Sequence, residues 1–141
     1  MEGSYTWNMD NWKRTAEQRK RGWLYLLEDM AADMMLLREC VPADDIDDCY
    51  NVLFRGIGGN RPWGSAIVTK ELAIKEIEFK NSYPGAVIAA EVTLPDGQPL
   101  IVISLANIAV LIVMVCFGKY EVLQSKFPWS RRCYDSKFHT N

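Results

Sequence analysis

The polar and apolar positions at the start of the chain predict a β-strand. In SYTWNMDNW (residues 4–12), Tyr5 and Trp7 lie on one side of an extended chain, and Thr6 and Asn8 lie on the other. Tyrosine and tryptophan both favour strands. Short polar side chains then end the strand. Such an end is typical of a turn, but it also suits a strand that delivers ligands to a site at the edge of a sheet.

A helix and a second strand follow. Residues 13–29 carry a partly periodic apolar set among charged residues, which predicts a helix. Residues 33–37, DMMLL, form a short apolar run bounded by charge, and this favours a buried strand. The order strand, helix, strand predicts a β-α-β unit, and therefore a sheet with helices on its faces.

Downstream, the pattern changes to short β segments. After a glycine-rich turn, residues 66–69 read as a strand, and residues 74–79, IKEIEF, alternate as a half-exposed strand does. The apolar stretches 86–94 and 99–105 flank Pro95-Asp96-Gly97, which predicts a hairpin. The predicted fold class is therefore α+β.

The run Leu100–Phe117 admits two interpretations. It is 18 residues long, and only Ser104 and Asn107 in it are polar, so it reaches the length of a membrane span. However, its β-branched residues are dense and its first part completes the hairpin. We expect a strand at least through Leu105, with a membrane-spanning helix as the alternative.

Composition and charge narrow the class of protein to which this chain can belong. The chain has 141 residues, of which 49% are hydrophobic and 24% charged, as in one soluble domain. Its net charge of −2 and pI of about 5.4 give no overall excess of positive charge for nucleic acid. The predicted helix does carry a basic run, which we interpret as a solvated helix face: Lys13, Arg14, Arg19, Lys20 and Arg21.

The cysteines give no metal or redox motif. Cys40, Cys49, Cys116 and Cys133 contain no C-x-x-C spacing, and His139 is the single histidine. This argues against a structural zinc site and favours free thiols in a reducing compartment. The opening MEGSYTW has neither a basic nor an apolar region typical of a secretory signal, so we expect a cytoplasmic protein.

Four short stretches occur in a recognisable order: WNMD (7–10), LRE (37–39), WGSAI (63–67) and ISL (103–105). Together they resemble the N-terminal half of the endonuclease/exonuclease/phosphatase superfamily, the metal-dependent phosphoesterases related to DNase I and exonuclease III. The resemblance covers about residues 4 to 107. It implies part of a four-layer phosphoesterase sandwich.

The resemblance also implies roles for particular residues. Asn8 and Asp10 match the family's first motif, in which the asparagine orients the phosphate and the attacking group. Glu39 matches the glutamate that binds a divalent metal, usually Mg²⁺. Such a cation neutralises the charge that builds on phosphoryl oxygens during hydrolysis. Arg61 is a candidate for contact with the substrate, which the resemblance implies is a phosphoester, with nucleic acid as one candidate.

The chain departs from the family pattern at several points. Arg38 replaces the usual glutamine, and Ala106 stands where the family commonly has a histidine. No Asp-x-Asn follows Glu39, and His139 is not in a Ser-Asp-His motif. We therefore expect impaired hydrolysis by this chain.

These departures also set the expected architecture. We expect an N-terminal part of the family domain at residues 1–107, with one mixed β-sheet, a flanking helix and the second sheet missing. Residues 108–141 would form a divergent tail. Two alternatives remain: a non-enzymatic membrane-attached protein with a span at 100–117, and a small soluble interaction domain without a catalytic site.

Overall fold

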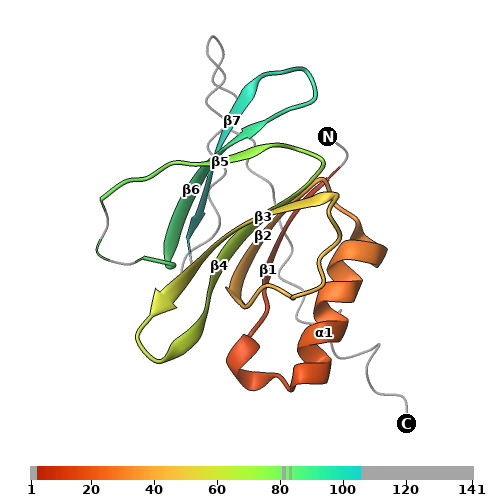
Figure 1. Cartoon of the computed structure of the whole chain (residues 1–141), viewed down its shortest axis with the longest axis vertical. Coiled ribbons are helices and arrows are strands. Elements are labelled where there is room, and N and C mark those ends of the chain that lie inside the picture. Colours follow the sequence, from red (N-terminus) through yellow and green to blue (C-terminus); the bar gives the residue numbers. More distant parts are fainter. Residues whose placement is uncertain (1–2, 81, 83, 106–141) are drawn as a thin grey trace.

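The part of the chain that the structure describes forms three layers, a helix, a first β-sheet and a second β-sheet (Figure 1). This arrangement is seen in a computed structural model that describes residues 3–80, 82 and 84–105. The layers are held by two groups of buried apolar side chains. One group lies between the helix and the first sheet, and the other lies between the two sheets.

The first sheet is mixed, as predicted. It contains β1 (Ser4–Asn8), β2 (Met34–Cys40), β3 (Tyr50–Gly58) and β4 (Arg61–Lys70), in the spatial order β1-β2-β4-β3. Strands β1 and β2 are parallel, whereas β4 runs antiparallel to both β2 and β3. The strand, helix, strand unit at the start of the chain is therefore confirmed.

Strand β2 is buried on both of its faces. Met35 and Leu37 belong to the apolar group beneath the helix, and Met34 and Leu36 belong to the group between the sheets. All four side chains are fully buried. A strand covered on both faces has no polar alternation, which explains the continuous apolar run in the sequence.

The helix that connects β1 to β2 starts at a well-formed cap. Helix α1 (Ala16–Leu24) begins at Thr15, whose hydroxyl accepts from the Gln18 backbone N–H at 3.2 Å. The Gln18 side chain in turn accepts from the Thr15 backbone N–H at 3.0 Å. The helix continues as one π-helical stretch, η2 (Tyr25–Met30), and ends at Ala31 with a φ of 41°.

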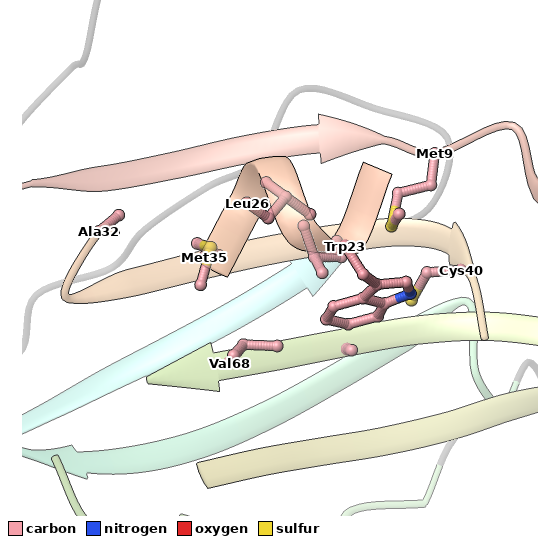
Figure 2. Packing of buried hydrophobic residues seen from close by; sticks show 9 residues of the cluster. Met9, Trp23, Leu26, Ala32, Met35, Cys40 and Val68 are labelled. Carbon is pink, nitrogen blue, oxygen red and sulfur yellow. The ribbon is translucent and has the colours of Figure 1, made fainter. Parts of the chain in front are cut away.

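The apolar side of this helix covers the first sheet. Figure 2 shows Trp23 and Leu26 directed from the helix toward the strands, where Met35 and Cys40 lie. The indole N–H of Trp23 donates to the Val41 carbonyl at 2.9 Å, so the one polar atom of this buried ring is satisfied. The prediction of a helix over residues 13–29 is confirmed, although the helix begins only at Ala16, after the first two basic residues, Lys13 and Arg14.

A second sheet is present, and the expectation that it is missing was wrong. It contains β5 (Ile74–Glu76), β6 (Val87–Thr93) and β7 (Pro99–Leu105) in that spatial order, all antiparallel. The hairpin prediction for β6 and β7 is confirmed, since Leu94 donates to the Gln98 carbonyl at 2.9 Å across the turn. The inner face of the second sheet is apolar and packs against the first sheet, which buries it.

The strand interpretation of the apolar run is confirmed through Leu105. A continuous helix over 100–117 is wrong at its beginning, because residues 100–105 pair with β6. The rest of the run, the domain boundary at 107 and the tail 108–141 lie outside the described residues. In the described part of the chain, no helix is both long and apolar enough to cross a membrane.

Other strand lengths differ from the predicted ones. Strand β4 is ten residues long and pairs with β3 over a hairpin, whereas only residues 66–69 were predicted as a strand. Gly64 permits this pairing, since a Cβ there would lie 1.9 Å from the Arg55 carbonyl oxygen. Conversely, β5 ends at Glu76, so the alternation over 74–79 overstated its length.

Candidate functional site

The ends of β1 and β2 meet at one edge of the first sheet. Asn8 is in register with Arg38, so residue 39 follows directly beside the end of β1. The ladder continues one step further, because the Met9 backbone N–H donates to the Arg38 carbonyl at 2.9 Å. Parallel strands end at the same edge, and the polar side chains that follow them are thereby brought together.

Asn8 and Glu39 contact each other directly. The Asn8 side-chain amide, Nδ2, donates to Glu39 Oε1 at 3.2 Å. These two side chains, which the family resemblance assigns to one site, therefore lie together at the same edge of the sheet. A hydrogen bond to a carboxylate from a neutral amide fixes one of its oxygens and leaves lone pairs for a further ligand.

Asn8 also takes part in a turn, the other interpretation that the sequence allowed for the end of this strand. Its Oδ1 accepts from the Asp10 backbone N–H at 3.0 Å, a bond typical of an Asx-turn. Asp10 has a φ of 46°, in the left-handed region that aspartate tolerates. The two interpretations of the opening stretch are thus compatible, because the two ends of one amide serve the turn and Glu39 separately.

Glu39 itself lies in an unusual backbone conformation. Its φ is 48°, and the register between β2 and β4 shifts between Leu37 and Cys40. A β-bulge of this kind bends the strand and turns a side chain away from the regular alternation. A left-handed conformation in a residue other than glycine is costly and clusters at functional sites. The bulge brings the Glu39 carboxylate to the Asn8 amide.

Trp12 is a site residue that the sequence pattern did not reveal. Its indole N–H donates to Glu39 Oε2 at 2.7 Å, although the side chain is 57% exposed. It lies on η1 (Asn11–Lys13), a single 3-10 turn, where no periodicity distinguishes a functional residue from a surface residue. Its only sequence signal is a large aromatic residue directly after a polar strand end.

Asp10 and Arg61 are less closely connected to this cluster. Among the described residues, the Asp10 carboxylate makes no hydrogen bond or ion pair, although its backbone carries the turn. Arg61 lies at the start of β4, three residues before Gly64, which pairs with Cys40 at the end of β2. Its guanidinium lies 5.5 Å from the centroid of the Trp63 ring, and no described hydrogen bond or ion pair joins it to Asn8 or Glu39.

The basic run of the helix has neighbours within the chain. Arg19 donates to the Arg14 carbonyl at 2.8 Å, and Lys20 lies 3.9 Å from an Asp45 carboxylate oxygen. Arg21 pairs with Glu17 on the exposed side of the helix. These contacts agree with the interpretation of a solvated helix face and give no reason to place a phosphate there.

The cluster offers few protein ligands for a metal. Glu39 supplies a carboxylate, the hard oxygen donor that Mg²⁺ prefers. Within the described ranges, no group of three histidine, cysteine, aspartate or glutamate side chains is placed to hold a metal ion. The neighbouring Cys40 is no substitute, because burial raises the pKa of its thiol to about 12. Glu39 therefore fits a weakly held, largely hydrated cation.

Comparison with known proteins leaves the family open: no protein-family model matches the chain, and a search of curated proteins also finds no match.

Proposed function

We propose that this chain carries part of the site of a metal-dependent phosphoesterase related to the endonuclease/exonuclease/phosphatase superfamily. In this proposal Glu39 binds Mg²⁺ and Asn8 orients the phosphate. Asp10 supports either role through its backbone turn and carboxylate. The proposed substrate is a phosphoester, with nucleic acid as one candidate.

One observation carries the proposal. The Asn8 amide and the Glu39 carboxylate are hydrogen-bonded at 3.2 Å, where two parallel strands end side by side. Strands hold such groups more rigidly than loops do, which is what positioned catalysis requires. The left-handed conformation of Glu39 is compatible with this role, since strained backbone conformations cluster at functional sites, but Ala31 at the end of the helix is left-handed too, so the hydrogen bond carries the argument.

The chemistry follows from charge. Hydrolysis of a phosphodiester builds negative charge on the phosphoryl oxygens, and a cation beside Glu39 would stabilise it. The Asn8 side chain donates a hydrogen bond without adding negative charge that would repel the substrate. The described residues supply no histidine for general base or acid catalysis. Loss of one positioned acid or base typically lowers the rate by about 10²–10⁴.

Metal binding is the direct test. Titration of the full chain with Mn²⁺, followed by electron paramagnetic resonance, should show weak binding that is lost in Glu39→Gln. Glu28→Gln is the matched control, because it removes the same charge from the exposed side of the helical segment. Equal Mn²⁺ binding by wild type and Glu39→Gln would contradict the proposed role of Glu39.

Hydrolysis is the second measurement. With Mg²⁺ and bis(p-nitrophenyl) phosphate, we expect turnover that is slow and that falls to the background rate in Glu39→Gln. Release of p-nitrophenol gives the rate. Slow turnover unchanged by the substitution would assign the hydrolysis to another site or to a contaminant. Fast turnover abolished by Glu39→Gln would show that this chain is not impaired.

A further inference from the structure

We infer that Trp12 is a positioning residue for the metal-binding carboxylate of Glu39. This inference rests on the proposed function and deepens it, because it assigns a residue outside the matched motifs to the same site. Trp12 would act through Glu39 and would not itself contact the reacting phosphate.

The hydrogen bonds of Glu39 carry the inference. Oε2 accepts from the Trp12 indole N–H at 2.7 Å, and Oε1 accepts from Asn8 Nδ2 at 3.2 Å. With one donor on each oxygen, rotation about the last torsion of the side chain would break both bonds. Each oxygen keeps a lone pair for a cation. Trp12 therefore restricts the carboxylate to one orientation without using up its capacity to bind.

The backbone holds Trp12 in place for this contact. The turn begins at Asp10, whose carbonyl accepts from the Lys13 N–H at 2.9 Å. Asn11 is only 6% exposed and anchors the middle of the turn. The Lys13 ammonium lies 4.4 Å from the centroid of the Trp12 ring, a cation–π contact that covers one ring face.

Burial does not explain the position of Trp12. The side chain is 57% exposed, and it is in neither of the buried apolar groups of the described residues. An indole N–H at the surface can bond to water at little cost, so stability alone does not call for the bond to Glu39. Partners that orient a metal ligand, however, typically change metal affinity by about 10- to 100-fold when they are removed.

The test separates positioning from folding. Trp12→Phe keeps an aromatic ring and removes the N–H donor. We expect Mn²⁺ affinity to fall about tenfold, at the low end of the usual range because the site is exposed. The thermal unfolding midpoint should stay close to that of the wild type. Tyr5→Phe is the matched control, since it removes a hydroxyl from an exposed aromatic residue of β1 and should leave the affinity unchanged.

A second measurement observes the contact without metal. In the ¹H–¹⁵N spectrum, the Trp12 indole proton should shift upfield in Glu39→Gln, because its acceptor loses its charge. An unshifted indole signal would overturn the inferred contact. Wild-type affinity in Trp12→Phe would overturn the positioning role and leave the proposed function standing. Failure of the wild type to bind Mn²⁺ would instead overturn the proposed function and this role together.

Discussion

At the scale of single residues, the site depends on the two ends of one amide. Asn8 Oδ1 closes the turn at Asp10 while its Nδ2 reaches Glu39. An aspartate could make the first bond but not the second, because a carboxylate has no donor at neutral pH. The choice of asparagine is therefore informative about Glu39 and not only about the turn.

This difference predicts the behaviour of Asn8→Asp. The variant places a second negative charge against Glu39, and we expect a loss of about 1–2 kcal/mol in the free energy of unfolding at pH 7. The deficit should shrink at high salt concentration, since added ions screen the repulsion between the two carboxylates. Urea unfolding at low and at high salt measures it.

Asn8→Ala is the comparison variant, because it loses both bonds and adds no charge. Its deficit relative to the wild type should change less between low and high salt than that of Asn8→Asp. Equal salt dependence of the two variants would mean that the side chains at positions 8 and 39 do not interact in solution.

At the scale of elements, the sequence predicted strand identity better than strand length. The polar residues at the ends of β1 and β2 could be predicted from the sequence, because a buried strand ends where its run of apolar residues ends. The β-bulge that reorients the Glu39 side chain could not be predicted from the sequence, since it arises where β2 pairs with β4, which is far along the chain. The same holds for Trp12, whose partner is 27 residues away.

The β3–β4 hairpin gives the prediction at this scale. Gly64 and Gly56 are opposite one another, yet only Gly64 is closely covered. A Cβ at Gly64 would lie 1.9 Å from the Arg55 carbonyl oxygen, while one at Gly56 would have ordinary contact with Phe54 at 3.9 Å. Gly64→Ala should lower the free energy of unfolding by about 1–3 kcal/mol or more.

Gly56→Ala is the matched control, and its effect should be clearly smaller. Chemical denaturation of the two variants gives the comparison. A larger loss in Gly56→Ala than in Gly64→Ala would contradict the described register of β3 and β4, in which the Gly64 backbone is the crowded one.

At the scale of the whole molecule, the second sheet changes the picture most. The family resemblance predicted one sheet with its partner missing, whereas β5 to β7 pack on the first sheet through their own apolar face. The turn Pro95-Asp96-Gly97 between two apolar stretches predicted the hairpin of β6 and β7 correctly. It could not say what the inner face of that hairpin covers, since this depends on contacts between residues far apart in sequence.

Packing between the two sheets makes Leu36 a sensitive position. Its side chain is fully buried among residues of both sheets, so Leu36→Ala should lower the free energy of unfolding by about 2–5 kcal/mol. Leu24→Ala, at a helix position that is 42% exposed, should cost far less. Similar losses in the two variants, measured by thermal denaturation, would argue against a packed layer between the sheets.

The double burial of β2 has a consequence for the timescale on which the site opens. Amide hydrogens of a strand that touches both apolar groups exchange with solvent only when both groups separate, which is close to global unfolding. Glu39 is near the end of this doubly buried strand, whereas Trp12 lies on a short surface turn. Opening of the turn would release the indole while the carboxylate stays in place. The rate at which solvent enters the space between Trp12 and Glu39 would then be set by fast fluctuations of the Trp12 turn alone.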